Sequence, residues 1–88
     1  MLVGRLDERP GGVPELTARE QDILDSIARG HTVRQTARTL GIAAKTVENT
    51  QARLFRKLGA HNRSAALTIA YRLGLVAPGE ATGEAASR

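Results

Sequence analysis

Apolar residues recur at intervals of three and four along four separate stretches of this chain, which is the spacing that one face of an α-helix produces. We therefore expect four helices, at about residues 18–29, 33–40, 44–58 and 63–73. Only a few residues separate one stretch from the next. Short connections are typical of neighbouring packed helices, so the pattern predicts a compact all-α domain.

Helix start and stop signals fall at the ends of the same stretches. Residues 17–20 (TARE) and 32–35 (TVRQ) have the form of a capping box, with a Thr hydroxyl first and a Glu or Gln three positions later. Asn62 is a candidate N-cap for the last helix. A glycine suited to a left-handed C-terminal cap follows each stretch: Gly30, Gly41, Gly59 and Gly74.

One apolar stripe per helix supplies the expected core. Thr36 is a polar residue within the stripe of the second helix, and Phe55 lies at the edge of the third. The ends of the core are expected to be closed by Leu16, Ile42 and Leu75. The stripes consist of Ile23, Leu24, Ile27 and Ala28; Val33, Ala37 and Leu40; Val47, Gln51, Leu54 and Leu58; and Ala66, Ile69, Ala70 and Leu73.

The connection between the second and third helices, LGIAA, predicts a helix-turn-helix at about residues 33–52. Ala37, Gly41 and Val47 stand at offsets of four and six. A helix-turn-helix needs a small residue where the helices cross, a Gly for the turn and a β-branched residue that pins the second helix. An ordinary corner between two bundle helices is the alternative interpretation of this spacing.

Positive charge is concentrated in the middle of the chain. The 88 residues carry a formal net charge of +4. Residues 30–63 contain seven Lys and Arg residues against the single acid Glu48, a net charge of +6, whereas residues 17–29 carry two Arg against three acids, a net charge of −1. This asymmetry indicates one surface that faces a polyanion.

Other chemistries find little support in the composition. The chain has no cysteine and no apolar run of membrane-spanning length, and its first residues lack the apolar region of a secretory signal, which favours the cytoplasm. His31 and His61 have no ligand partners at metal spacing, and Glu20 and Asp22 have no nucleophile or base beside them. We expect no metal site, cofactor, small-molecule ligand, membrane contact or catalytic residue.

The composition also suggests how the chain is divided. Residues 1–15 are rich in Gly and Pro and are expected to form a flexible linker, residues 16–76 to form the domain, and residues 77–88 to form a disordered tail. Both a domain cut from a longer regulator and a small stand-alone regulator fit this organisation.

Several motifs within residues 15–76 resemble the LuxR/GerE-type DNA-binding domain. They are the LTxRE pattern that begins at Leu16, the pair Ala28 and Gly30, IAAKTV, KLG and NRSAAL. The resemblance implies a four-helix domain, a third helix that enters the major groove of double-stranded DNA, and a fourth helix that forms a homodimer on paired half-sites. The family includes effector domains of bacterial response regulators and quorum-sensing receptors.

The chain departs from the family pattern near the expected recognition helix. Residues 33–36 read VRQT where the family usually has Asn-Lys-Glu-Ile, and Ala43 replaces the Ser that usually caps the helix. Glu48 and Thr50 stand where the family favours Lys and His. Each departure concerns residues through which the family contacts DNA.

The orientation of the third helix follows from an advance of about 100° per residue. With Val47 placed inward, the candidate base-reading residues face outward or flank that side: Lys45, Glu48, Asn49 and Ala52. Asn pairs bidentately with adenine, Ala contacts a thymine methyl group, and Glu48 either accepts from a cytosine amino group or stabilises the helix N-terminus and repels phosphate. The candidate phosphate-binding residues are Arg34, Arg38, Thr46, Arg53, Arg56 and Lys57.

Some of these residues also have structural interpretations. Arg56 and Lys57 lie in the last turn of a helix, where cations oppose the macrodipole. Arg63 is expected to pair with Glu20 or Asp25 at the edge of the core. In the fourth helix the candidate dimerisation residues are Ser64, Leu67, Thr68 and Tyr71, and burial against the first helix or the tail is the alternative.

The sequence therefore predicts a sequence-specific DNA-binding domain of a bacterial transcriptional regulator, with residues 44–58 in the major groove. A helical module that docks on RNA polymerase or another regulator without reading DNA is the alternative. A helical enzyme fragment is disfavoured because no catalytic constellation is present.

Overall fold

Four helices and no strand make up the described part of the chain, residues 13–77 of the computed structural model. The helices are α1 (Ala18–Ala28), α2 (Val33–Leu40), α3 (Ala44–Leu58) and α4 (Arg63–Leu73). The predicted all-α class is confirmed, and the expected bounds agree except that α1 ends one residue early, with Arg29 as its C-cap. The linker and tail predictions fall almost entirely on residues outside the described range.

Local side-chain bonds begin three of the four helices, as the sequence predicts. Both reciprocal bonds of the capping box are present at the start of α1 and at the start of α2. The Asn62 side chain accepts a hydrogen bond from the Ala65 N–H at the start of α4. α3 differs, because Ala43 at its N-cap has no side chain that could make such a bond.

The turn between α2 and α3 depends on Gly41. Its φ of 69° lies in the left-handed region, and the Ile42 N–H bonds back to the Ala37 carbonyl at 3.0 Å, which closes the end of α2. Apart from its two chain neighbours, no residue has an atom within 4 Å of where a Cβ on Gly41 would be, so backbone conformation rather than space favours glycine here. Ala37 and Val47, the other two predicted motif positions, are both buried.

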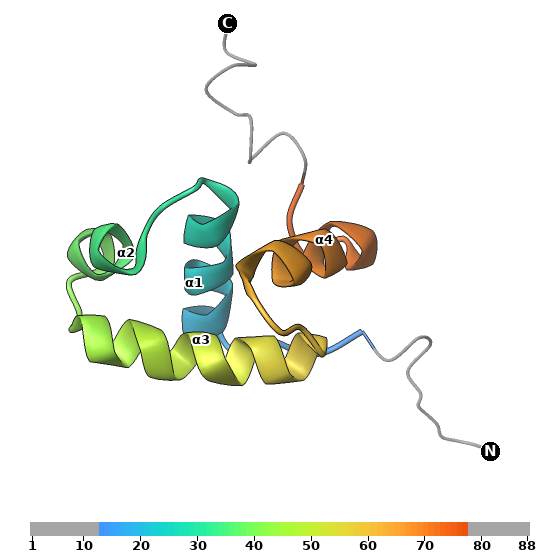
Figure 1. Cartoon of the computed structure of the whole chain (residues 1–88), viewed down its shortest axis with the longest axis horizontal. Coiled ribbons are helices and arrows are strands. Elements are labelled where there is room, and N and C mark those ends of the chain that lie inside the picture. Colours follow the sequence, from blue (N-terminus) through green and yellow to red (C-terminus); the bar gives the residue numbers. More distant parts are fainter. Residues whose placement is uncertain (1–12, 78–88) are drawn as a thin grey trace, which may run out of the picture.

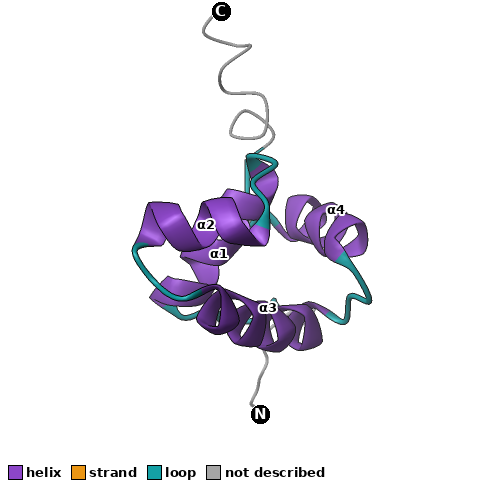
Figure 2. Ribbon diagram, turned by 60° about the vertical axis from the view of Figure 1, so that its left-hand side comes forward, coloured by secondary structure: helices purple, strands orange, loops and turns teal. Residues whose placement is uncertain are grey.

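The four helices are arranged so that α3 lies along one border of the domain. In Figure 1, α3 runs along the lower edge and the other three helices all lie above it. Figure 2 shows the same arrangement after a turn of 60°. α3 packs against α1, α2 and α4. One long side of α3 therefore has no other described helix against it.

The core is aliphatic and lies where these helices meet. Its most deeply buried large side chains are Ile23, Leu24, Val47 and Leu54. Thr36, the expected polar residue in the stripe of α2, is also buried. Leu16, Ile42 and Leu75 are partly buried against the core as expected, whereas the buried Val76 was not foreseen.

The buried stripe of α3 corrects one prediction. Gln51 was expected to be buried, but Thr50 is the enclosed residue, 2% exposed, whereas Gln51 is half-buried. At about 100° per residue these two positions lie on opposite edges of the inward face. The short Thr side chain is covered there, while the longer Gln accepts a hydrogen bond from Arg63 at the start of α4.

Candidate nucleic-acid interface

The side of α3 that faces away from the other helices collects the predicted base-reading residues. Lys45, Glu48, Asn49 and Ala52 are all exposed, and Arg56 continues the same side by one more turn. They are brought together because positions three, four and seven apart share a helix face. These exposed cationic, amide, methyl and carboxylate groups belong to one helix, and Figure 1 shows that this helix runs along one border of the domain.

Positive charge borders this face at its N-terminal end. Arg34 and Arg38 are exposed on α2, and Thr46 is exposed in the first turn of α3. The first backbone bond of α3 runs from the Val47 N–H to the Ala43 carbonyl, at 3.1 Å. The three preceding N–H groups of the helix have no intrahelical partner, so the positive end of the helix dipole adds to the positive charge at this end of α3.

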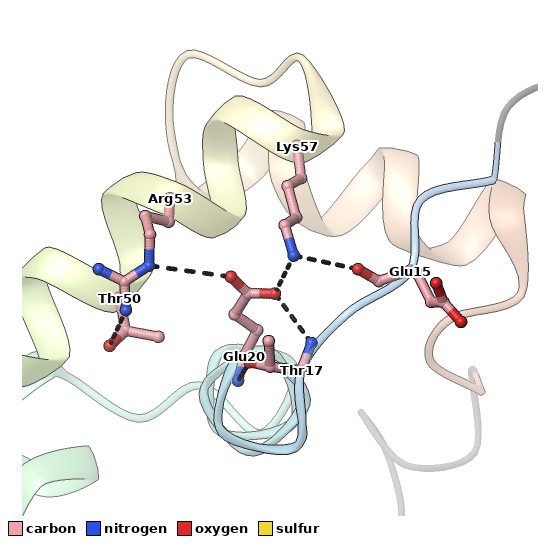
Figure 3. Close-up of polar contacts among 6 residues, drawn as sticks. All are labelled: Glu15, Thr17, Glu20, Thr50, Arg53 and Lys57. Carbon is pink, nitrogen blue, oxygen red and sulfur yellow. Dashed lines mark hydrogen bonds and ion pairs between the residues drawn. The ribbon is translucent and has the colours of Figure 1, made fainter.

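Two of the six predicted phosphate ligands have their charged groups directed toward α1 (Figure 3). The Lys57 Nζ lies 2.7 Å from Glu20 Oε1 and donates to the Glu15 carbonyl at 3.0 Å. The Arg53 Nε lies 4.0 Å from Glu20 Oε2, and its terminal nitrogen donates to Thr50 Oγ1 at 3.4 Å. Arg53 and Lys57 therefore occupy the flank of α3 rather than its outward face.

Glu20 receives these cations in an almost fully enclosed position, with 2% of the residue exposed. Burial by itself raises the pKa of Glu20. The hydrogen bonds from Lys57 and the Thr17 N–H, together with the charges of Lys57 and Arg53, outweigh burial and hold the pKa below its ordinary value of 4.5. The carboxylate is therefore ionised at neutral pH and fastens the start of α1 to the C-terminal half of α3.

Glu48 is the acid on the candidate interface and differs sharply from Glu20. It is exposed beside Asn49, and no hydrogen bond or ion pair joins its carboxylate to another residue in the range 13–77. A carboxylate with no partner among the described residues, on a cationic helix, can accept a hydrogen bond from an external donor. Both sequence interpretations of Glu48, base reading and tuning of the helix end, are compatible with this position.

Arg63 has a structural role, but its predicted partners are wrong. Its guanidinium donates to Gln51 Oε1 at 3.2 Å and to the His31 carbonyl, which joins α4 to α3 and to the loop after α1. Glu20 is engaged by Lys57, and Asp25 accepts a bond from Gln21 at 2.9 Å. The two expected acids therefore already have nearer donors.

The candidate dimerisation residues lie together along α4. Ser64 and Thr68 are exposed, whereas Leu67 and Tyr71 are half-buried. Ala66 and Ala70 form the buried side of the helix. The four candidates, at offsets of three, four and seven, form a mixed apolar and hydroxyl strip that the domain covers only in part.

Within residues 13–77, no three His, Cys, Asp or Glu side chains are grouped so that they could hold a metal ion. None of the helices in that range has the length and apolar character needed to cross a membrane.

Comparison with known proteins identifies the family. Residues 14–70 match the GerE family, described as bacterial regulatory proteins of the luxR family. The chain is 45% identical over 60 residues to the HTH-type transcriptional activator RamA of Corynebacterium glutamicum, covering 68% of this chain and 21% of RamA. It is 38% identical over 76 residues to the probable transcriptional regulatory protein NarL of Mycobacterium tuberculosis, covering 85% of this chain and 35% of NarL.

Solved structures of LuxR-type receptors have the same fold. The fold superposes on the Vibrio cholerae VqmA dimer, a LuxR-type receptor, with a TM-score of 0.68 at 33% identity, covering 83% of this chain and 34% of VqmA. A VqmA–ligand–DNA complex matches with a TM-score of 0.67. The chain spans about a fifth to a third of the length of these relatives. It belongs to the luxR family of bacterial regulatory proteins and carries the helix-turn-helix DNA-binding domain of these transcriptional regulators.

Proposed function

We propose that this chain is the effector domain of a bacterial transcriptional regulator and binds double-stranded DNA sequence-specifically, with α3 in the major groove. The observation that carries the proposal is the uncovered side of α3, where Lys45, Asn49, Ala52 and Arg56 are exposed together. The major groove admits a single α-helix, and its base edges present distinct donor and acceptor patterns. A domain that binds the DNA of the bacterial nucleoid would act in the cytoplasm.

Base discrimination is assigned to the N-terminal half of the exposed side. Asn49 pairs with the N6 and N7 atoms of adenine, Ala52 contacts a thymine methyl group, and Lys45 donates to guanine. Glu48 accepts from the amino group of cytosine or excludes phosphate from its vicinity. Because each of these side chains is exposed, no rearrangement of the core is needed for contact.

Phosphate contacts are assigned to residues that surround the reading side. Those on α2 and at the start of α3 face one wall of the groove, and those further along α3 face the other. Lys57 differs from the other predicted ligands because its ammonium group is bonded to Glu20. The remaining five are Arg34, Arg38, Thr46, Arg53 and Arg56.

Dimerisation through α4 is the third part of the proposal. The strip of Ser64, Leu67, Thr68 and Tyr71 is self-complementary in character, as a two-fold interface requires. The related VqmA is described as a dimer. A two-fold pair of domains would place two copies of α3 on half-sites separated by about one helical turn of DNA.

Duplex binding measured against salt concentration tests the function. We expect the logarithm of the affinity to fall linearly with the logarithm of the salt concentration, because phosphate contacts release counterions. A chain that binds RNA polymerase or another protein but shows no salt-dependent duplex binding would instead be the protein-docking module. Equal affinity for every duplex sequence would contradict sequence-specific regulation.

Replacement of one reading residue tests the site. We expect Asn49→Ala to weaken binding to a selected duplex by about 1–3 kcal/mol, with little effect on random duplex, because a bidentate base contact contributes only at the preferred sequence. Fluorescence anisotropy on both duplexes measures the difference. Thr39→Ala, an exposed change on α2 outside the proposed contact set, is the matched control. Equal losses on the two duplexes would argue against direct reading by Asn49.

A further inference from the structure

One buried carboxylate on α1 is shared by two cations from α3. The Glu20 side chain is 3% exposed and receives Lys57 at 2.7 Å and Arg53 at 4.0 Å (Figure 3). Residues 53 and 57 are one helical turn apart, so both side chains leave α3 on the same flank. The group has two positive charges and one negative charge, which leaves one positive charge uncompensated.

The two cations are held differently. Lys57 donates to both Glu20 and the Glu15 carbonyl, and its side chain is 36% exposed. Within residues 13–77, Arg53 makes only the long contact with Glu20 and a 3.4 Å bond to Thr50, and its side chain is 55% exposed. The compensated charge is therefore that of Lys57, and the uncompensated charge is that of Arg53. A planar guanidinium also has further N–H donors that remain available to solvent.

We propose that Glu20 is a positioning residue for DNA binding, which withdraws Lys57 from the phosphate-binding set and leaves Arg53 on the flank of α3 to bind phosphate. The inference rests on the DNA-binding function proposed above. Lys57 is accordingly a structural cation rather than a phosphate ligand.

This arrangement affects specificity because phosphate contacts carry no direct sequence information. An additional cation on the flank of α3 would strengthen binding to every DNA sequence, whereas the reading residues strengthen binding only to preferred sequences. Glu20 keeps one such cation away from DNA. Through the same contact it fastens α1 to α3 and so fixes the direction in which Asn49 and Ala52 face.

The salt dependence of binding to a random-sequence duplex counts phosphate contacts and so tests the proposal. Each contact contributes about 0.9 to the slope of log affinity against log salt concentration. We expect Arg53→Met and Arg56→Met each to reduce the slope by about 0.9. An unchanged slope in Arg53→Met would overturn the proposal.

A near-isosteric variant of Glu20, alone and combined with a Lys57 variant, guards against loss of the fold. Glu20→Gln keeps the capping box, since Gln35 forms the same box on α2, but it removes the negative charge that compensates Lys57. We expect its slope to rise by about 0.9 and its preference for a selected duplex over random duplex to fall. The double variant Glu20→Gln/Lys57→Met removes this cation as well and should return the slope to the wild-type value. A slope about 0.9 below the wild-type value would mean that Lys57 already binds phosphate in the unmodified chain and would overturn the proposal.

The outcomes separate this inference from the function on which it rests. Absence of salt-dependent duplex binding by the unmodified chain would contradict the proposed function itself. Normal binding by that chain, with a Glu20→Gln slope equal to or below its own, would contradict the positioning role alone. Circular dichroism of each variant at the assay temperature confirms that folded protein is compared.

Discussion

α1 and α2 begin with the same capping box, yet the two boxes lie in opposite environments. At α1 the Glu20 N–H donates to Thr17 Oγ1 at 3.1 Å and the Thr17 N–H donates to Glu20 Oε1 at 2.9 Å. At α2 the corresponding bonds between Gln35 and Thr32 are 3.0 and 2.8 Å. The local geometry is nearly identical. Gln35, however, is exposed, whereas Glu20 is 2% exposed.

The difference shows that a capping motif determines where a helix starts but not what else its side chains do. Gln35 only satisfies a backbone N–H, and a neutral amide is sufficient for that. Glu20 satisfies the equivalent N–H and also receives Lys57 and Arg53 from α3, which requires a carboxylate. The neighbouring helix therefore decides whether the third residue of the box has a role in the tertiary structure.

Truncation of the third residue of each box should produce the largest difference in unfolding free energy between the two sites. We expect Glu20→Ala to lower the free energy of unfolding by about 2–3 kcal/mol. It removes the cap bond and the partner of Lys57, whose partial exposure keeps the loss below that of a fully buried pair. Gln35→Ala should cost about 0.5 kcal/mol, the loss of one exposed hydrogen bond. Urea unfolding followed by circular dichroism measures both.

The Thr partners of the boxes supply the control. Thr17→Ala and Thr32→Ala each remove one cap acceptor, so we expect similar losses of about 1 kcal/mol from the two sites. Equal effects of Glu20→Ala and Gln35→Ala would mean that the contacts with α3 add nothing to stability. In that case the two boxes would be equivalent in energy as well as in geometry.

Acid should weaken the α1 box selectively. The folded-state pKa of Glu20 lies below its ordinary value of 4.5, so the stability it contributes is fully present above that value and is lost as pH falls through the folded-state pKa. Glu20→Gln cannot titrate, so the difference in unfolding free energy between it and the unmodified chain should shrink as pH is lowered below 4.5. Urea titrations from neutral pH into acid measure this difference.

Gln35→Glu is the matched test at the other site. An exposed carboxylate in the α2 box gains no buried ion pair, so it should reproduce little of the pH dependence seen at Glu20. A difference between Glu20→Gln and the unmodified chain that stayed constant down to the lowest pH would show that the charge of Glu20 has no part in its contribution.

Local features of this domain could be predicted from the sequence because their partners lie close along the chain. Each cap bond joins residues three apart, and the direction in which Asn49 points follows from the fixed rotation per residue of a helix. The four helices, both capping boxes, the left-handed turn at Gly41 and the exposure of the reading residues all depend on such short-range rules.

Features that depend on which helices meet could not be predicted in this way. The bond between Lys57 and Glu20 joins residues 37 apart, and the bond from Arg63 to the His31 carbonyl joins residues 32 apart. Charge alone suggested Glu20 as a partner for Arg63, because the packing of α3 against α1 was unknown. For a similar reason the sequence predicted Gln51 rather than Thr50 as the buried residue, since both lie near the edge of the buried stripe.

The start of α3 extends the comparison, because it has no side-chain cap at all. Ala43 has φ and ψ of −73° and 148°, an extended conformation that suits an N-cap, so a Ser there could bond the N–H of Thr46 without a change in the backbone. We expect Ala43→Ser to raise the free energy of unfolding by about 1 kcal/mol, measured by urea unfolding. Ala44→Ser, one residue inside the helix, cannot cap and should not stabilise the domain. If the two substitutions had equal effects, the missing cap would not be a weakness of α3, and its unpaired N–H groups would be adequately satisfied by water.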